Sequence, residues 1–289
     1  MLRCLFLFLA LLFAALPAGA AELKLASWNI AWLTLRQPGD PELPRSLEPR
    51  SARDLQLLAA YARRLDADII ALQEVDGPEA AAQVFDPRHY AFHFAEESDV
   101  QRVGFAVRHG LRVTRNPDLA ALDLRPRARR SLRRGVDITV EAGAQHLRLL
   151  AVHLDAGCHS DALDLSQICD SLGQQARILA QWVAARQREG VAFALMGDFN
   201  RRMSRPDDDM LRLLQSAAPL LRVTEGSSSP CWARRGGGTP FIDHIMLGGA
   251  ARQWWQRDSL RVMVYAEQAP EYRNRLSDHC PISVRVKLP

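Results

Sequence analysis

The chain has 289 residues, of which 48% are hydrophobic, 24% charged and 7% aromatic. This composition suits a folded core and excludes a disordered protein or a repeat array. With 37 basic and 33 acidic residues the formal net charge is only +4, so charge alone does not indicate a nucleic-acid-binding protein. Nearly every cation is arginine, which suits phosphate binding, although a genome rich in G and C produces the same bias.

The first twenty residues have the pattern of a targeting segment. Arg3 provides a positive charge, residues 5–16 are almost all aliphatic or phenylalanine, and residues 18–20 are small. This pattern predicts a secretory signal peptide over residues 1–20. A membrane anchor is the alternative, but the apolar run is shorter than the roughly 20 residues that span a bilayer. We therefore expect a secreted or periplasmic protein with one folded domain over residues 21–289.

The rest of the chain alternates between predicted strands and helices. Ser51, followed by Asp54, has the pattern of a helix N-cap. In chain order, hydrophobic periodicity predicts a strand at 23–30, a proline-rich loop at 37–50, a helix from Ser51 to Leu65, strands at 69–74, 103–107, 136–140 and 146–153, a helix at 172–188, and strands at 192–196, 241–247, 260–264 and 282–286. Such an order predicts a single α/β sandwich.

Four cysteines remain after the predicted signal: Cys158, Cys169, Cys231 and Cys280. An even number in an exported protein favours disulfides, and their spacing does not match a zinc site. Three pairings are open. Because Cys158 and Cys169 flank one polar loop, we expect them to pair with each other, which leaves Cys231 to pair with Cys280.

Polar side chains recur where apolar strands stop. Any one of them has an ordinary explanation, because Asn and Asp start turns and a single His is more often structural. The set as a whole is harder to explain in that way. It consists of Asn29, Glu74, His153, Asp198 with Asn200, Asp243 with His244, and Asp278 with His279.

These residue types suit phosphoryl transfer. Oxygen ligands from Asn29 and Glu74 can hold Mg²⁺, which prefers hard oxygen donors and retains several waters. An imidazole with a carboxylate can orient and deprotonate a water molecule, while a carboxamide and a second His donate to phosphate oxygens.

Six short motifs, in this order, resemble the endonuclease/exonuclease/phosphatase superfamily, which includes nucleases of the DNase I type. They are "SWNI", "LQEV", "VHL", "GDFN", "IDHI" and "SDHCP", and the resemblance extends from residue 23 to the C-terminus. It implies a four-layered α/β sandwich in which two mixed β-sheets are flanked by helices. It also implies that residues 21–289 form a catalytic domain with a divalent cation, Mg²⁺ first and Mn²⁺ or Ca²⁺ as alternatives.

The resemblance also implies roles for individual residues. Asn29 and Glu74 would be metal ligands, with Asp278 beside the metal. His153 would contact phosphate. Asp198 would position or activate the attacking water, and Asn200 would stabilise the transition state. His279 would be the general base or a phosphate contact, oriented by Asp243.

Some residues near these motifs have no assigned role or an uncertain one. His244 stands where many members have an aromatic residue, so it is left out of the catalytic set. The arginine-rich stretch 125–134, in particular Arg133 and Arg134, is a candidate contact for the substrate backbone, with a solvated basic loop as the alternative. Trp28 and Trp32 flank Asn29, where core packing is expected more than base stacking.

Three functions remain open from the sequence. The first is a secreted Mg²⁺-dependent nuclease that acts on DNA or RNA as a monomer without a stable protein partner. The second is a lipid-directed phosphodiesterase or phosphatase of the sphingomyelinase kind, for which an exposed apolar hairpin at residues 252–256 is the candidate phospholipid contact. The third is a non-catalytic binding module, whose mark would be the loss of Glu74, Asp198 or His279, all of which are present.

Overall fold

The computed structural model describes residues 21–126, 128, 131–233 and 237–289. The predicted signal peptide and three arginines of the basic stretch, at positions 127, 129 and 130, lie outside the described residues. Within these residues, no helix is both long and apolar enough to cross a membrane.

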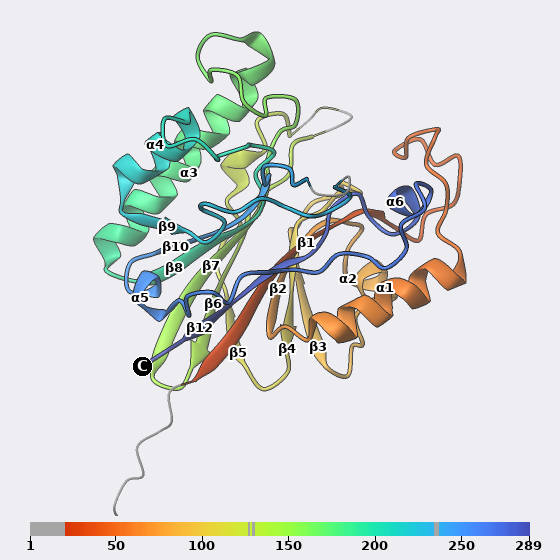
Figure 1. Cartoon of the computed structure of the whole chain (residues 1–289), viewed down its shortest axis with the longest axis horizontal. Coiled ribbons are helices and arrows are strands. Elements are labelled where there is room, and N and C mark those ends of the chain that lie inside the picture. The colour runs from red at the N-terminus through yellow and green to blue at the C-terminus, as the bar shows by residue number, and fades with distance from the viewer. Residues whose placement is uncertain (1–20, 127, 129–130, 234–236) are drawn as a thin grey trace, which may run out of the picture.

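Two mixed six-stranded sheets pack face to face between helices (Figure 1). The first sheet has the order β11 (Arg261–Val262), β12 (Ile282–Lys287), β1 (Glu22–Leu33), β2 (Ile69–Val75), β4 (Gly104–Arg108), β3 (Tyr90–Phe94). The second has the order β5 (Arg112–Arg115), β6 (Val136–Ala142), β7 (Gln145–His153), β8 (Ala192–Asp198), β10 (Asp243–Gly248), β9 (Leu220–Arg222).

Helices cover the outer face of each sheet. On the first sheet these are α1 (Ala52–Leu65) and α2 (Pro78–Ala81), with α6 (Tyr272–Arg275) nearby; on the second they are α3 (Asp170–Glu189) and α4 (Asp209–Ala217) (Figure 1). Short elements at η1 (Ala120–Leu122), η2 (Gln167–Cys169) and α5 (Ala251–Trp254) complete the set. The predicted four-layered α/β sandwich is therefore confirmed.

Three apolar clusters hold the layers together. The central one fills the space between the sheets with Val, Ile, Leu and Ala from both inner faces, and the other two seat the helices on the outer faces. Because both faces of the central strands are buried, these strands are almost wholly apolar. Helix α1 starts as expected: the Ser51 side chain accepts from the Asp54 amide, and the Asp54 carboxylate accepts from the Ser51 amide at 2.9 Å.

The directions of the strands bring several strand ends to one edge of the sandwich. β1 and β2 are parallel in the first sheet, and β7 and β8 are parallel in the second. β10 runs antiparallel to β8, and β12 runs antiparallel to β1. Consequently the ends of β1, β2, β7 and β8 and the starts of β10 and β12 lie at the same edge of the sandwich.

Gly197, in the "GDFN" motif, allows β7 and β8 to approach closely just before this edge. Its φ is +147°, and a Cβ placed there would lie 2.0 Å from the carbonyl oxygen of Val152 in β7. Because that contact is with backbone of the neighbouring strand, it cannot be relieved by a rotamer change.

We expect Gly197→Ala to destabilise the fold by about 3 kcal/mol or more, because a steric clash adds to the cost of the backbone conformation. Gly110→Ala is the matched control, since Gly110 also has a positive φ, of +95°, but a Cβ added there would have no neighbouring atom within 4 Å. Urea unfolding of both variants measures the difference. Equal stability losses for the two would contradict the close-approach argument.

Candidate active site

The predicted polar residues meet at the edge where the strands end. Asn29 and Glu74 come from β1 and β2, and His153 and Asp198 end β7 and β8 in direct register with each other. Asp243, at the start of β10, pairs with Asp198. His279 and Asp278 lie on the segment that leads into β12. The two sheets thus contribute to one site from opposite sides.

Backbone strain is concentrated around this site. Ala31, Trp32, Glu74 and Asn200 all have positive φ, of 44°, 60°, 58° and 49° respectively. The register between β1 and β2 shifts here, because Asn29 pairs with Gln73 while Leu33 pairs with Val75. Such a bulge turns side chains away from the regular alternation of a strand, and left-handed non-glycine residues cluster at functional sites.

The side chain of Asn29 links the two sheets. Its Nδ2 donates to Glu74 Oε1 at 3.0 Å and to Asp198 Oδ2 at 3.1 Å. The same two carboxylate oxygens each lie 3.7 Å from His153 Nε2. Asn29 and His153 therefore hold two carboxylates from different sheets close to each other.

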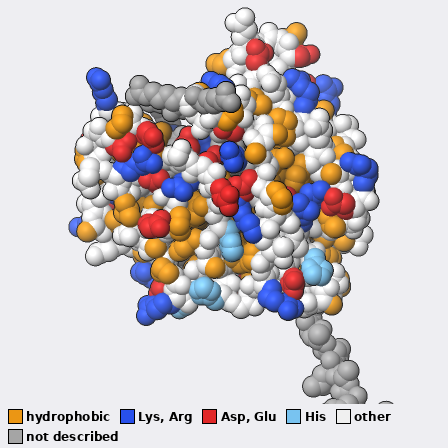
Figure 2. All heavy atoms as spheres, turned by 180° about the vertical axis from the view of Figure 1, so that it is seen from behind, with side chains coloured by type: hydrophobic (Ala, Val, Ile, Leu, Met, Phe, Trp, Pro, Cys, Tyr) orange, Lys and Arg blue, Asp and Glu red, His pale blue; other side chains and the backbone are white. Residues whose placement is uncertain are grey.

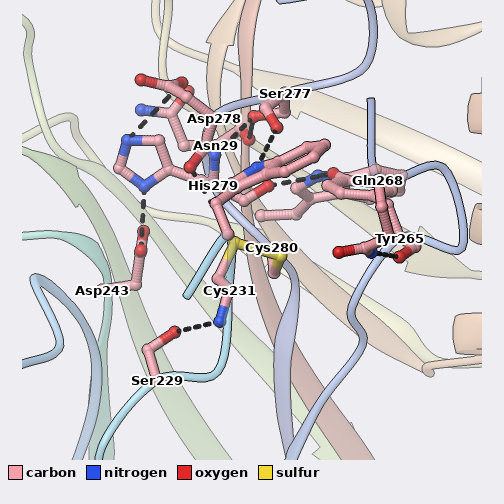
Figure 3. The surroundings of a disulfide bond; sticks show 12 residues. Asn29, Ser229, Cys231, Asp243, Tyr265, Gln268, Ser277, Asp278, His279 and Cys280 are labelled. Carbon is pink, nitrogen blue, oxygen red and sulfur yellow. Dashed lines mark hydrogen bonds and ion pairs between the residues drawn. A yellow bond between two sulfur atoms is a disulfide. The ribbon is translucent and has the colours of Figure 1, made fainter. Parts of the chain in front are cut away.

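His279 and Asp243 form a hydrogen-bonded pair (Figure 3). The distance from His279 Nδ1 to Asp243 Oδ2 is 2.8 Å, although 36 residues separate the two in the chain. His279 Nε2 lies 3.7 Å from Asp198 Oδ2 and 4.0 Å from Asp278 Oδ1. If Nδ1 donates its proton to Asp243, Nε2 carries the lone pair that a general base needs.

The surroundings shift the pKa of both members of the Asp198–His279 contact. Burial opposes the charged form of His279, but the carboxylates of Asp243 and Asp198 outweigh it and hold the pKa of His279 well above 6.5. Burial raises the pKa of Asp198 to about 7, although the positive charge of His279 acts in the opposite direction. The pKa of Asp198 thus lies in the range where a carboxyl group transfers protons efficiently near neutral pH.

The other two histidines of the motifs are neutral. Burial, together with the charge of Arg133, holds the pKa of His153 well below 6.5. Burial lowers the pKa of His244 to about 4. His244 is fully buried, between the hydroxyl of Thr224 at 2.8 Å and the carbonyl of Arg201 at 2.9 Å. Both ring nitrogens of His244 therefore have hydrogen-bond partners within the fold.

Asn200 acts on its neighbours through its backbone and its side chain. Its amide donates to Asp198 Oδ1 at 2.8 Å, and its Nδ2 donates to the carbonyl of Leu154 at 2.9 Å. These contacts orient the Asp198 carboxylate and tie the ends of β7 and β8 together. A direct contact of Asn200 with the transition state would use its remaining Nδ2 hydrogen.

Arg133 and Arg134 have different environments. Arg133 is buried, donates from Nη2 to the carbonyl of Leu154 at 3.0 Å, and lowers the pKa of His153. It lines a cleft of about 390 Å³ together with Trp32 and Arg125. The backbone amide of Arg134 donates to Glu97 at 3.2 Å. Trp28, in contrast, is fully buried and bonds to Tyr265, as core packing requires.

Two residues outside the predicted set hold the site in place. The hydroxyl of Ser277 donates to the carbonyl of Asn29 at 2.8 Å and accepts from the amide of His279 at 3.0 Å. Arg50 donates to five backbone carbonyls, those of Ile30, Ala31, Trp32, Arg275 and Leu276, at 2.6–3.1 Å.

Arg50 thereby joins the strained end of β1 to the segment that carries Asp278 and His279. Burial lowers the pKa of Arg50 to about 10, a value at which it keeps its charge at neutral pH. Sequence reasoning missed Arg50 because it lies in a proline-rich loop, where periodicity carries no signal. Ser277, in contrast, is the first residue of the "SDHCP" motif, so the motif could have identified it as a residue of the site.

The acidic residues on one side of the site fit a hard cation. Glu74 and Asp278 line one cleft of about 320 Å³. Glu74 is mostly buried, and its Oε1 lies 3.0 Å from Asn29 Nδ2 and 3.7 Å from His153 Nε2, with the carboxylate of Asp198 on the other side of these two groups. Collecting carboxylates in this way favours a divalent cation held by oxygen. Glu74 and Asp278 therefore fit a hard divalent cation.

Asn29 fits a cation less directly. Its Oδ1 accepts from the amide of Ala31 at 2.9 Å, so its Nδ2 faces the carboxylates. Ligation through oxygen requires the carboxamide to turn over. An alternative cation site would use Asp198, Asp243 and His279, whose ligand atoms lie within 4.8 Å of one another. In this site, however, the ring nitrogens of His279 already make the contacts described above, including the bond from Nδ1 to Asp243. The carboxylates on the Glu74 side are therefore better placed to hold a cation than this cluster.

Disulfides brace both loops beside the site. Cys158 is joined to Cys169, and Cys231 to Cys280, with Cα–Cα distances of 5.1 and 5.6 Å. The second bond holds the residue next to His279 (Figure 3). This is the pairing expected from the sequence.

Each disulfide is expected to contribute about 2–4 kcal/mol to the free energy of unfolding. Replacing Cys231 and Cys280 together by serine should therefore lower stability and also reduce turnover, because the His279 segment loses its anchor. The Cys158→Ser and Cys169→Ser pair is the comparison, and chemical denaturation with a steady-state assay measures both effects. Free thiols found by peptide mapping of the non-reduced protein would contradict the assignment.

Two sheets that converge on neutral and charged imidazoles, carboxylates and a carboxamide define a phosphoric ester hydrolase. The chain belongs to the endonuclease/exonuclease/phosphatase family, whose model matches residues 26–279. A comparison with curated protein sequences gives no match.

Solved structures of similar fold cover nearly the whole chain. TDP2 of D. rerio, complexed with a single-strand DNA product, has a TM-score of 0.58 and 18% identity over 92% of this chain and 98% of its own. The catalytic domain of human Nocturnin, with bound sulfate, has a TM-score of 0.57 and 14% identity over 91% of this chain and 93% of its own. The 3' phosphatase NExo of Neisseria, bound to a product DNA hairpin, has a TM-score of 0.54 and 18% identity over 91% of this chain and 98% of its own. At these identities the likeness establishes the fold.

Proposed function

We propose that the protein is an exported, Mg²⁺-dependent nuclease that hydrolyses phosphodiester bonds of DNA or RNA. The observation that carries the proposal is the convergence of Glu74, Asp198 and the His279–Asp243 pair at one edge of the sandwich. Each of these groups has a chemical task in the hydrolysis of a phosphodiester.

The roles follow from protonation and geometry. His279, oriented by Asp243, takes the proton of the attacking water through Nε2, and Asp198, within 3.7 Å of that nitrogen, positions the water. Neutral His153 has its Nε2 directed to the same site and donates a hydrogen bond to a phosphate oxygen. A cation held by Glu74 and Asp278 would supply charge stabilisation for the phosphate oxygens.

Export is supported by the two disulfides, because such bonds persist in oxidising compartments. The predicted signal peptide, residues 1–20, is consistent with this location. The protein would then act in the periplasm or outside the cell, as a monomer.

Nucleic acid as substrate is supported by the DNA bound in two proteins of similar fold, D. rerio TDP2 and Neisseria NExo. The lipid alternative depended on an exposed apolar hairpin at residues 252–256. The structure contradicts that expectation, because these residues include α5, in which Trp254 is buried against the core between the sheets. Leu165 and Ile168 in the Cys158–Cys169 loop are exposed, at 84% and 57%. Because exposed apolar side chains can contact a lipid surface, a phospholipid is included among the substrates to be tested.

A substrate panel tests the proposal. Purified mature protein is assayed with plasmid DNA, RNA, sphingomyelin and bis(p-nitrophenyl) phosphate, each with and without Mg²⁺. We expect Mg²⁺-dependent cleavage of nucleic acid that weakens steeply with salt, because arginine contacts to phosphates release counterions. Salt-insensitive hydrolysis of sphingomyelin with plasmid DNA and RNA intact would overturn the nuclease function and favour the lipid one.

A further inference from the structure

A third cleft, of about 410 Å³, opens beside the catalytic pair of His279 and Asp243. Asp243, His279 and Asp278 form part of its lining. Its volume lies in the range of about 300–1,000 Å³ that is usual for small-molecule sites, so it has room for a nucleotide-sized group. A ligand in this cleft would therefore be a direct neighbour of the scissile phosphate.

Two arginines, Arg202 and Arg273, line this cleft from different segments. Arg202 follows β8 and the "GDFN" motif, whereas Arg273 lies in α6. Neither guanidinium has a carboxylate within 4.0 Å among the described residues. Most arginines near the site are, in contrast, paired or buried. Charges of both signs are interspersed on the face that Figure 2 shows. Two arginines in one cleft with no carboxylate partner in the described part of the chain differ from this pattern and indicate a site for an anion.

The acidic run next to Arg202 does not neutralise it. Asp207 pairs with Arg205 at 2.6 Å, Asp208 with Arg201 at 2.8 Å, and Asp209 with Arg212 at 2.9 Å. Each of these three carboxylates has its own arginine. The charge of Arg202 is therefore available to a ligand in the cleft.

The backbone around Arg202 is fixed to the disulfide loop. The amide of Arg202 donates to the carbonyl of His159 at 2.8 Å, and the His159 ring bonds through Nδ1 to the carbonyl of Asn200 at 2.9 Å. The preceding residue, Arg201, is buried and also bonds to the carbonyls of Cys158 and Asp161. Arg202 thus starts from a rigid backbone held at a set position relative to Asn200 and Asp198.

The carboxylates in the cleft already have other partners. Asp243 bonds to His279 at 2.8 Å, and Asp278 Oδ1 lies 4.0 Å from His279 Nε2. The remaining charge of the cleft is therefore positive, which favours an anion and disfavours a choline headgroup.

We propose that Arg202 and Arg273 form a second phosphate subsite, which binds the nucleic-acid phosphate adjacent to the scissile one. The proposal rests on the proposed nuclease function and specifies its substrate: a chain with at least one further phosphate next to the bond that is cleaved.

The test compares two substrates, of which only the longer one carries phosphates beside the scissile one. One is a dinucleoside monophosphate, whose single phosphate is the scissile one; the other is a tetranucleotide of the same sugar type. Arg202→Gln and Arg273→Gln are each expected to lower kcat/KM for the tetranucleotide about tenfold and to change the value for the dinucleoside monophosphate less than twofold. Each substitution should also reduce the slope of log(kcat/KM) against log[salt] by about 1 for the tetranucleotide.

Arg205→Gln is the matched control. It removes the same charge from an exposed arginine that is bonded to Asp207 and lies outside this cleft. Equal losses on both substrates, or a loss with Arg205→Gln as large as with Arg202→Gln, would overturn the subsite. If the wild-type protein hydrolyses bis(p-nitrophenyl) phosphate but no nucleic acid, the nuclease function itself fails. A wild-type nuclease unaffected by both substitutions refutes the subsite alone.

Discussion

His279→Ala and Asp198→Ala are each expected to remove most of the turnover, by about 10²- to 10⁴-fold. The reason is that His279 Nε2 and Asp198 Oδ2, 3.7 Å apart, act on the same attacking water. Because the two act as a unit, the double variant should lose far less than the product of the two single losses. Single-turnover kinetics on the nucleic-acid substrate measure all three variants.

His146→Ala is the matched control for this series. His146 is exposed near the start of β7, the strand whose other end carries His153. Its replacement should leave the rate unchanged. A His279→Ala variant that cleaves at the wild-type rate would refute the catalytic assignment.

The same pair predicts the pH dependence. The pKa of His279 is raised, so the free base that accepts a proton becomes populated only above the usual histidine range. Activity should therefore rise through neutral pH and level off on the alkaline side. Asp243→Asn removes a charge that raises the pKa, so the rising limb should move toward acid while the maximal rate falls. An activity that declines with increasing pH over this range would instead identify protonated His279 as a phosphate contact.

Removal of divalent cations is expected to abolish turnover, and Glu74→Gln should raise the Mg²⁺ concentration needed for half-maximal activity at least about tenfold. The substitution keeps the size of the side chain but removes a charged oxygen ligand from a hard cation. Glu79→Gln in α2, an exposed glutamate close by in sequence, is the matched control. Circular dichroism should show that both variants remain folded.

Metal binding can also be measured apart from activity. Calorimetric titration with Mg²⁺ should show weaker binding for Glu74→Gln than for the wild type and for Glu79→Gln. Full activity in excess EDTA would rule out the cation site on the Glu74 side.

Sequence patterns predicted the central strands well because these strands are buried on both faces and are nearly continuous apolar runs. They predicted the edges of the sheets less well. The strand expected at residues 260–264 is only β11, Arg261–Val262, and the short strands β3, β5 and β9 were missed. The missed edge strands have only three to five residues, so the alternation of apolar and polar residues covers too few positions to be recognised.

Helix α4, Asp209–Ala217, was also missed, although its signal was present in the sequence. The side chain of Asp208 caps it by accepting from the amide of Leu211, and Met210, Leu211 and Leu214 form its buried face. The helix is short and follows a turn with Pro206, so local periodicity covers little more than two turns. Its packing against α3 stabilises it, which is a tertiary effect.

The identities of the candidate catalytic residues could be predicted from the sequence, because polar residues at the ends of apolar strands have few structural explanations when six such positions occur together. Their arrangement could not. The contact between Asp243 and His279 depends on the antiparallel placement of β10 and β12 beside the parallel pairs. Arg50 and Arg202 lie in loops, and Arg273 lies in a single helical turn. In such segments neither hydrophobic periodicity nor a sequence motif indicates which residue has a function. The positions of these arginines are decided by backbone carbonyls, disulfides and neighbouring carboxylates that only the folded chain brings together.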